Sequence, residues 1–191
     1  MTRSAMDAEH RAGLDPSPWV RRWSHLVPKD AAVLDVACGS GRHVRWFASR
    51  GCRVTGVDRD AAALEPLRDI AEAVAADIEG GPWPLAGRRF DAIVCTNYLW
   101  RPLLPTLIDA LAEHGVLLYE TFAVGNETVG KPSNPNFLLR PAELLAAVGG
   151  LRVVGYEDGF IDAPARFVQR VVAVRDDPST HPPHRWLLPA T

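Results

Sequence analysis

Short apolar stretches alternate with longer amphipathic stretches along most of this chain. The apolar stretches are rich in valine, leucine and isoleucine and are bounded by glycine, proline or aspartate, a pattern typical of buried β-strands. Strands are predicted over residues 31–36, 53–57, 74–76, 90–95, 116–119, 151–156 and 167–174. In the amphipathic stretches the apolar side chains recur at helical spacing. Helices are predicted over residues 16–27, 41–49, 60–71, 102–113 and 141–148.

The order of these elements indicates an α/β fold of the doubly wound type. Strands alternate with helices and then two strands follow in succession, which favours a mostly parallel sheet with an antiparallel strand at its end. The segment 121–139 is too long for a plain connection, and loops of that length are usually functional or disordered. We expect one domain over residues 16–175, a disordered N-terminus over 1–15 and an irregular tail, rich in proline and histidine, over 176–191.

Composition narrows the class of protein. The chain has 191 residues, of which 47% are apolar and 23% charged, with a net charge of −2. No apolar run approaches the roughly 18 residues that cross a bilayer, and no basic block indicates a nucleic-acid surface. The chain has three cysteines, at positions 38, 52 and 95, and all lie in or beside predicted strands. Their odd number and these positions indicate buried free thiols in a reducing compartment. A cytoplasmic protein is therefore predicted.

The sequence Val-Leu-Asp-Val-Ala-Cys-Gly-Ser-Gly-Arg-His at 33–43 joins a predicted strand to a predicted helix. Gly39 and Gly41 lack a Cβ, so the backbone can approach a bound molecule closely. A dinucleotide-binding loop would carry a third glycine, where this chain has Val44, and would seat a pyrophosphate on the helix N-terminus. Asp35 disfavours such an anion and favours a ligand with an ammonium or sulfonium group. The loop therefore points to S-adenosylmethionine, and the alternative is a glycine-rich turn that binds nothing.

Aspartates close three successive predicted strands, at Asp35, Asp58 and Asp77. The carboxyl ends of neighbouring strands in a doubly wound sheet line one crevice, so these side chains are expected to face one ligand. The two oxygens of Asp58 suit a vicinal ribose diol. Asp77 is expected to accept from an adenine amino group, with Ile78 against the ring. The alternative is that each aspartate forms a turn or, for Asp58, caps the helix that begins near residue 60.

With these motifs in place, residues 33–174 resemble the class I S-adenosylmethionine-dependent methyltransferases. The resemblance rests on the glycine loop, on Asp58, on Asp77 and on the strand Phe90-Asp91-Ala92-Ile93-Val94-Cys95-Thr96-Asn97. Residues 112–119 resemble the helix-turn-strand that follows in this family. The sequence Tyr-Glu-Thr-Phe at 119–122 is similar to small bacterial tellurite-resistance methyltransferase-like proteins. The family implies a seven-stranded, mostly parallel sheet with an antiparallel last strand.

The resemblance also implies a role for each motif residue. The cofactor-binding residues that it implies are Asp35, Ala37, Gly39, Gly41, Asp58, Arg59, Asp77, Ile78, Cys95 and Asn97. Asp35 is expected near the methionine amino group, and residues 95–98 beside the sulfonium. Ala37 stands where the family commonly has glycine, and a small side chain is expected to be tolerated there. The sequence Thr96-Asn97-Tyr98 departs from the Asn/Asp-Pro-Pro-Tyr/Phe signature of amino-directed methylases, which weakens base or glutamine methylation.

Methyl transfer from a sulfonium needs alignment more than a base, because the donor is already activated. No residue of the chain stands out as a base. The catalytic candidates, which follow the fourth and fifth predicted strands, are Glu120, Tyr98 and Arg101. Arg101 is expected either to bind an anionic acceptor or to pair with Glu127 or Asp109. Further candidates for the acceptor pocket are Thr121 and, with core packing as the alternative, Trp100, Tyr119 and Phe122. Three asparagines of the long segment, Asn126, Asn134 and Asn136, are expected to form part of a lid. His43 is expected only to open a helix.

These observations predict a methyltransferase that acts on a small molecule, as a monomer or homodimer, without a nucleic-acid or membrane partner. Two alternatives stay open, a non-catalytic S-adenosylmethionine-binding module and a nicotinamide-dependent oxidoreductase. The small size and mild negative charge disfavour a macromolecular acceptor. No metal site is predicted, because His181 and His184 lack a second ligand pair. Residues 186–188 either fold back on the domain or contact a partner subunit.

Overall fold

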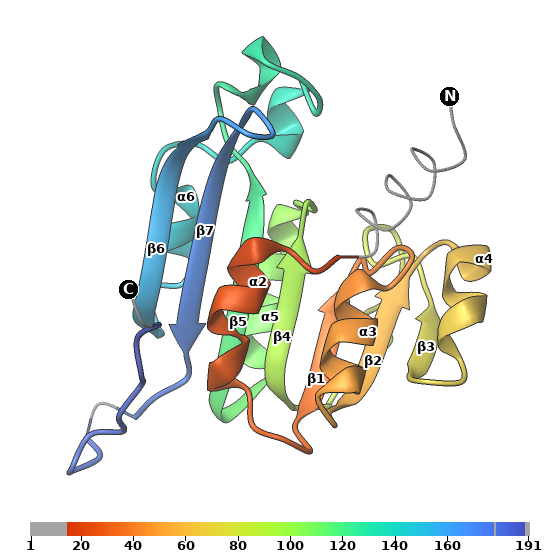
Figure 1. The fold of residues 1–191 in the computed structure, drawn as a ribbon, viewed down its shortest axis with the longest axis vertical. Coiled ribbons are helices and arrows are strands. Elements are labelled where there is room, and N and C mark those ends of the chain that lie inside the picture. Colours follow the sequence, from red (N-terminus) through yellow and green to blue (C-terminus); the bar gives the residue numbers. More distant parts are fainter. Residues whose placement is uncertain (1–14, 178, 190–191) are drawn as a thin grey trace.

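Seven strands form one sheet in the computed structural model, which describes residues 15–177 and 179–189 (Figure 1). The strands are β1 (Ala32–Val36), β2 (Arg53–Asp58), β3 (Glu72–Ala75), β4 (Phe90–Thr96), β5 (Leu111–Phe122), β6 (Arg152–Ile161) and β7 (Arg166–Val174). Their order across the sheet is β3-β2-β1-β4-β5-β7-β6. Strands β1 to β5 pair in parallel, whereas β7 runs antiparallel to both β5 and β6. The predicted doubly wound, mostly parallel seven-stranded sheet with an antiparallel last strand is confirmed.

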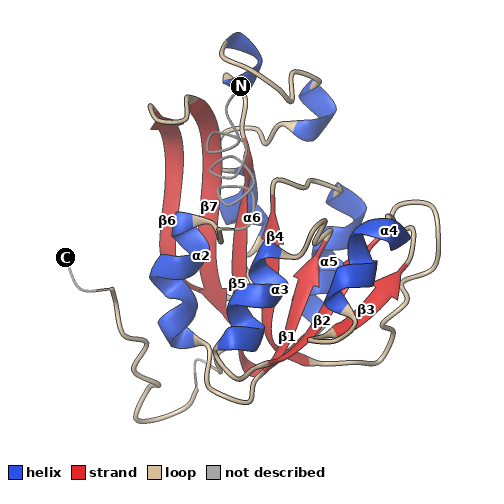
Figure 2. Ribbon diagram, turned by 45° about the vertical axis from the view of Figure 1, so that its right-hand side comes forward, coloured by secondary structure: helices blue, strands red, loops and turns tan. Residues whose placement is uncertain are grey.

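Helices cover both faces of this sheet (Figure 2). Those on one face are α2 (Pro18–Trp23), α3 (Arg42–Ser49) and α4 (Ala61–Leu64), and those on the other are α5 (Leu104–Asp109) and α6 (Glu143–Ala147). The first face buries a cluster that includes Trp19, Phe47 and Val94, and the second buries one that includes Ile93 and Leu107. Because neighbouring residues of a strand point to opposite faces, a central strand such as β4 must be apolar at both.

The helix predicted over 60–71 is much shorter than its pattern suggested. Asp60 caps α4 by accepting hydrogen bonds from the amides of Ala62 and Ala63. The helix then tightens into a 3-10 turn over Glu65–Leu67. Pro66 lies in this turn and has no amide hydrogen to continue the α-helical ladder. Strand β3 consequently begins at residue 72, earlier than predicted, and ends before Asp77.

The prediction of a helix over 102–113 was wrong at its end. Helix α5 stops at residue 109, and β5 begins at residue 111 and continues to 122. The prediction followed leucines 103, 104, 107 and 111, which fit a helical spacing. Leu111, however, is a buried residue of β5, where it pairs with Phe90 of β4. Strand β6 likewise extends to residue 161, so the segment around Pro164 is a short turn to β7 and not an irregular piece.

Other expectations from the sequence have mixed outcomes. The three cysteines are free and buried, as predicted. Every helix among the described residues is too short or too polar to cross a membrane. Trp186 folds back onto the core cluster beneath α2, where its indole donates to Asp176 over 3.3 Å. The disordered N-terminus predicted over 1–15 lies almost wholly outside the described residues, and the domain boundaries stay a prediction.

Candidate cofactor and acceptor site

Three cavities lie at the carboxyl ends of the strands. The Asp58 cavity, of about 320 Å³, is lined by residues that include Ala37, Asp58, Arg59, Asp77, Ile78 and Tyr98. The Gly39 cavity, of about 300 Å³, is lined by residues that include Ala37, Gly39, Arg42, Thr96, Asn97 and Tyr98. The Phe122 cavity, of about 220 Å³, is lined by residues that include Glu79, Asn97, Tyr98, Thr121, Phe122 and Phe137. Tyr98 lines all three, so the cavities meet around this side chain.

The backbone between β1 and α3 has the conformation that the glycines predicted. Gly39 and Gly41 have φ angles of 53° and 78°, and Ala37 has a φ of 51°. A Cβ built on Gly39 would meet no atom within 4 Å, so that side of the loop is open. Ala37 stands where the family commonly has glycine, and because its φ is positive, its Cβ makes this left-handed backbone conformation strained. Gly41 is buried and caps α3, and its predicted contact with the cofactor is not tested by the cavities.

Asp58 ends β2 and has two structural contacts. Its Oδ2 accepts a hydrogen bond from the amide of Gly39 over 2.8 Å, and its Oδ1 accepts one from the amide of Asp60 over 2.9 Å. Asp58 therefore ties the glycine loop to β2 while it lines the cavity. The cap of α4 is Asp60, so the alternative that Asp58 caps this helix is wrong. Each carboxylate oxygen keeps further acceptor capacity for a ligand.

Asp77 is exposed and forms a turn. Its Oδ1 accepts hydrogen bonds from the amides of Glu79 and Gly80 over 2.9 and 3.1 Å, and these bonds hold the pKa of the Asp77 carboxyl below its usual value. The turn places Ile78 and Glu79 at the wall of the Asp58 cavity. Both roles considered for Asp77, turn former and cavity residue, are thus combined in one position.

Asp35 lies beneath the loop and is 1% exposed. Its Oδ1 is 3.8 Å from Nδ1 of His43, and its buried Oδ2 has no hydrogen-bond partner among the described residues. His43 does more than open a helix, because its Nε2 accepts a hydrogen bond from the amide of Ser17 over 3.1 Å. This bond places the ring proton of neutral His43 on Nδ1, toward Asp35.

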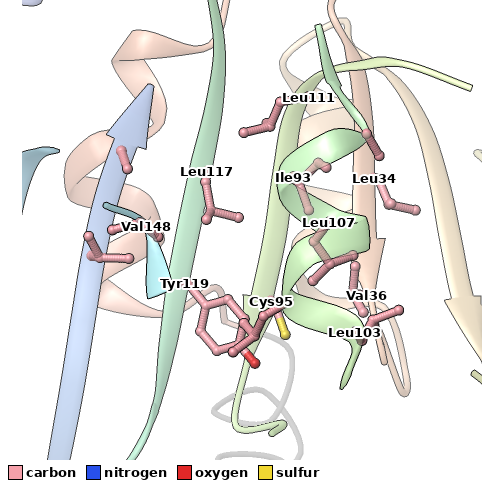
Figure 3. Close-up of a cluster of buried hydrophobic side chains, with 14 of the residues drawn as sticks. Leu34, Val36, Ile93, Cys95, Leu103, Leu107, Leu111, Leu117, Tyr119 and Val148 are labelled. Carbon is pink, nitrogen blue, oxygen red and sulfur yellow. The ribbon is translucent and has the colours of Figure 1, made fainter. Parts of the chain in front are cut away.

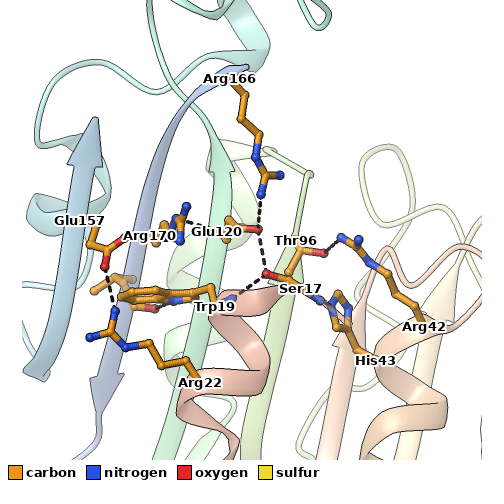
Figure 4. Close-up of polar contacts among 11 residues, drawn as sticks. Ser17, Trp19, Arg22, Arg42, His43, Thr96, Glu120, Glu157, Arg166 and Arg170 are labelled. Atoms are coloured by element: carbon orange, nitrogen blue, oxygen red, sulfur yellow. Dashed lines mark hydrogen bonds and ion pairs between the residues drawn. The ribbon is translucent and has the colours of Figure 1, made fainter. Parts of the chain in front are cut away.

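Glu120 belongs to a buried polar cluster on the α2 and α3 face (Figure 4). Its Oε1 accepts a hydrogen bond from the hydroxyl of Ser17 over 3.0 Å, and its Oε2 lies 3.1 Å from Nε of Arg170. Arg166 approaches the same carboxylate at 3.9 Å. Glu120 is 1% exposed and is not among the residues that line the three cavities. The structure therefore does not bring this catalytic candidate to the Asp58, Gly39 or Phe122 cavity.

Tyr98 and Tyr119 have different environments, because Tyr98 follows β4 whereas Tyr119 lies within β5. Tyr119 packs in the core on the α5 face together with Cys95 (Figure 3). Its hydroxyl donates to the carbonyl of Tyr98 over 2.8 Å. Burial raises the pKa of the Cys95 thiol to about 12, and this side chain is fully buried away from the cavities. Burial, followed by the charge of nearby Glu79, raises the pKa of Tyr98, so its phenol stays protonated and is no base.

Arg101 pairs with neither Glu127 nor Asp109. Its Nε and Nη2 lie 2.6 and 3.0 Å from the two carboxylate oxygens of Glu143. Its Nη1 and Nη2 also donate to the carbonyls of Asn136 and Leu138 over 2.7 and 2.9 Å. Arg101 thus holds the long loop after β5 and is not among the residues that line the three cavities.

The other loop candidates also have structural contacts. Asn126 is buried, donates to the carbonyl of Pro132 over 3.0 Å and accepts from the amide of Phe167 over 3.3 Å. The side chain of Asn134 caps the turn that contains Asn136. The loop instead contributes Pro132 and Phe137 to the Phe122 cavity. Sequence reasoning missed Phe137, Glu79 and Arg42, because only the folded loops bring them to the cavities.

The residues present fit a nucleoside with a cationic amino-acid arm. Asp35 Oδ2 is a buried carboxylate oxygen that lacks a hydrogen-bond partner among the described residues, and such an atom suits an ammonium group, although Asp35 itself is not among the residues that line the three cavities. The open side of Gly39 leaves space where any side chain would intrude. Asp58 supplies acceptor oxygens to a cavity that Ile78 and Tyr98 also line. The fold and these residues are consistent with the class I S-adenosylmethionine-dependent methyltransferase type.

Comparison with known proteins agrees with this class. A family model described as a methyltransferase domain matches residues 33–115. Trans-aconitate 2-methyltransferase from Paracidovorax citrulli is 40% identical over 104 residues, 48% of this chain and 39% of that protein. The tRNA U34 carboxymethyltransferase from Vibrio vulnificus is 28% identical over 159 residues, 73% of this chain and 49% of that protein. The chain spans less than half the length of these curated relatives.

Solved structures show the same fold at low sequence identity. TehB from Haemophilus influenzae has a TM-score of 0.67 and 17% identity, over 84% of this chain and 62% of that chain. A TehB-like SAM-dependent methyltransferase from Corynebacterium glutamicum has a TM-score of 0.63 and 20% identity, over 89% of this chain and 95% of that chain. The resemblance to class I S-adenosylmethionine-dependent methyltransferases is confirmed, and S-adenosylmethionine is the cofactor of that class.

Proposed function

We propose that the protein transfers a methyl group from S-adenosylmethionine to a small-molecule acceptor. The observation that carries this proposal is the position of Tyr98, whose side chain lines all three cavities. A ligand that extends through the Asp58 and Gly39 cavities would pass this residue, which also borders the Phe122 cavity. The methyltransferase domain match supports a methyl donor over a nicotinamide cofactor.

Each part of the donor has candidate partners in this proposal. Asp58 would accept from the ribose hydroxyls, and Ile78 would lie against the adenine. The unpaired Oδ2 of Asp35 would accept from the methionine ammonium. When bound, S-adenosylmethionine supplies a methyl group on a sulfonium, which is already activated for displacement. Asn97 and Tyr98 would then align the acceptor, and such positioning supplies much of the catalysis in reactions of this kind.

A small acceptor fits the geometry better than a macromolecule. The Phe122 cavity has a volume of about 220 Å³ and is partly covered by Pro132 and Phe137 of the long loop. The relatives include trans-aconitate and aminosugar methyltransferases as well as a tRNA carboxymethyltransferase. The size of the cavity favours the small-molecule group. A cytoplasmic location and a monomeric or homodimeric state stay predictions.

Binding of S-adenosylhomocysteine, measured by calorimetry, tests the cofactor site. Asp58→Asn should weaken binding by about 10- to 100-fold, because hydrogen bonds to a charged group contribute about 1.5–3 kcal/mol. The asparagine oxygen can still accept from the amide of Gly39, whereas the hydrogen bond from the amide of Asp60 is lost. Asp69→Asn, an exposed carboxylate outside the three cavities, is the matched control and should bind normally. Equal affinity in both variants would refute the ribose assignment.

A further inference from the structure

The charge of the Phe122 cavity bears on the kind of acceptor. Glu79 is the one charged residue among the eight that line it. The remaining lining is mostly apolar or aromatic, with Tyr98, Phe122 and Phe137 as its three rings. A small neutral or cationic molecule is therefore favoured in this space over an anion.

Four of the arginines that could reverse this charge are held elsewhere, and Arg59 lines the neighbouring Asp58 cavity. Arg101 forms a fork with Glu143 and the loop carbonyls, as described above. Arg42 lines the Gly39 cavity and donates to the hydroxyl of Thr96 over 3.0 Å. Arg166 and Arg170 face Glu120 in the buried cluster. Among the described residues, no lysine, arginine or histidine side chain lines the Phe122 cavity.

Tyr98 adds a polar group to these walls. Its hydroxyl is buried and has no hydrogen-bond partner among the described residues. A protonated phenol can donate to a lone pair or accept from an N–H. The Tyr98 carbonyl is held by the hydroxyl of Tyr119, which fixes the backbone on which the ring is carried. The cavity therefore offers a fixed hydrogen-bonding group next to a carboxylate and aromatic rings.

We propose that the acceptor is a small amine, methylated at its neutral nitrogen, and that Glu79 and the aromatic walls determine this specificity. The proposal rests on the proposed methyltransferase function. The nitrogen lone pair forms the new N–C bond while the C–S bond of the donor breaks and its electron pair goes to sulfur. The positive charge moves from sulfur to nitrogen, and a proton then leaves the methylated ammonium for solvent.

This movement of charge explains why the walls matter. In the transition state positive charge arrives in the Phe122 cavity, where a carboxylate and ring faces attract it. Glu79 therefore interacts more strongly with the transition state than with the neutral amine, which is the condition for lowering a barrier. An anionic acceptor such as a carboxylate would instead meet Glu79 as a like charge during binding.

The test compares amines with carboxylates and a thiol of matched carbon skeleton. Benzylamine, phenethylamine and cyclohexanemethylamine are incubated with isotopically labelled S-adenosylmethionine beside benzoate, phenylacetate, cyclohexanecarboxylate and benzyl mercaptan. Products are separated and identified by mass spectrometry, at a pH where part of each amine is neutral. We expect N-methylated products from the amines at rates at least about tenfold above those of the carboxylates and the thiol.

Two variants identify the role of Glu79. Glu79→Gln should lower kcat/KM for the amines about five- to tenfold, because one charge interaction near the surface is lost. The control is Glu113→Gln, whose carboxylate is 81% exposed and lies outside the cavity, and it should leave kcat/KM unchanged. Because Glu79 also borders the Asp58 cavity, the affinity for S-adenosylhomocysteine is measured for each variant and should change less than about twofold.

The outcomes separate the two proposals. If S-adenosylhomocysteine binds but methyl groups go preferentially to carboxylates or the thiol, the amine specificity is wrong and the methyltransferase function stands. Binding without transfer to any amine also overturns the amine proposal and favours the non-catalytic module. Amine transfer that is unaffected by Glu79→Gln overturns the role of Glu79. Failure of the wild-type protein to bind S-adenosylhomocysteine overturns the proposed function itself.

Discussion

Replacing Arg101 by methionine tests how the long loop after β5 is held against the cavities. The guanidinium forms a two-point ion pair with Glu143 and bonds to the carbonyls of Asn136 and Leu138. These two carbonyls flank Phe137, which lines both the Asp58 and the Phe122 cavities. The methionine keeps the unbranched carbon chain and removes every donor, so the variant isolates the polar contacts.

The structure gives the expected loss of stability. The side chains of Arg101 and Glu143 are 35% and 23% exposed, so solvent screens the ion pair and about 1 kcal/mol is a fair value for it. Each bond from the guanidinium to a loop carbonyl adds about 1 kcal/mol net of the water that replaces it. The free energy of unfolding should therefore fall by about 3 kcal/mol, which lowers Tm by about 6–12 °C in a domain of this size.

Urea unfolding and amide hydrogen exchange measure the two parts of this prediction. Exchange should become faster over residues 132–138, because the loop loses its attachment. The matched control is Arg68→Met, which breaks a 2.8 Å pair with Glu65 whose side chains are 52% and 73% exposed. That variant should be close to wild type. If Arg101→Met is no more destabilised than Arg68→Met and its loop exchange is unchanged, the loop is held by other contacts and the reasoning fails.

The same pair predicts a pH dependence. The hydrogen bond from Arg101 is the main cause that holds the pKa of Glu143 below its ordinary value of 4.5. A carboxyl whose pKa is lowered on folding contributes stability above its unfolded pKa, and this contribution is lost as the pH falls through the folded pKa. The stability difference between wild type and Arg101→Met should thus be full above pH 4.5 and shrink below it. A difference that stays constant down to strongly acidic pH would contradict this linkage.

Two further predictions concern the backbone around the cavities. Ala37→Gly should raise the free energy of unfolding by about 0.5 kcal/mol, because relief of a left-handed alanine contributes about 1–2 kcal/mol and the greater freedom of the unfolded chain offsets about 0.4–1 kcal/mol of this. The same change within α3, Ala48→Gly, should instead cost about 1 kcal/mol. If thermal unfolding shows the same sign for both variants, backbone strain at Ala37 is excluded. Tyr119→Phe should lower stability by about 1–2 kcal/mol, because it leaves the carbonyl of Tyr98 with only the weak thiol donor of Cys95, 3.9 Å away. A loss near zero in chemical unfolding would show that the thiol alone satisfies this carbonyl.

The residues at the Asp58 and Gly39 cavities could be predicted because their positions depend on local pattern. Parallel strands deliver their last residues to one edge of the sheet, so Asp58 and Asp77 were identifiable from the apolar runs before them. The left-handed backbone at Gly39 was likewise predictable, since glycine adopts it without strain. These signals need only the sequence on either side of each residue.

The lining of the Phe122 cavity and the surroundings of Glu120 could not be predicted, because they depend on loop conformation and on strand register. Glu79 and Phe137 reach the Phe122 cavity from loops that are distant in sequence, and no periodicity marks them. Glu120 resembles a catalytic carboxylate at a strand end, but its pairing with Arg170 follows from the register between β5 and β7. A sequence shows the charge on each strand without showing which charges lie opposite.

That register gives Glu120 a role that its position in the sequence did not suggest. Thr96, Glu120, Arg170 and Glu157 are successive partners across β4, β5, β7 and β6. The antiparallel β7 thus places an arginine beside a buried carboxylate, and the hydroxyl of Ser17 attaches the start of α2 to the same carboxylate.

This row of side chains is connected by hydrogen bonds to residues that line the Gly39 cavity. Thr96 accepts a hydrogen bond from Arg42 of the Gly39 cavity, and the amide of Asn97 donates to the carbonyl of Glu120 over 2.9 Å. We therefore propose that Glu120 positions the end of β4 and does not react with the acceptor. This buried carboxylate already faces two arginines and a serine hydroxyl, and it is not among the residues that line the three cavities, so a ligand in those cavities does not reach it.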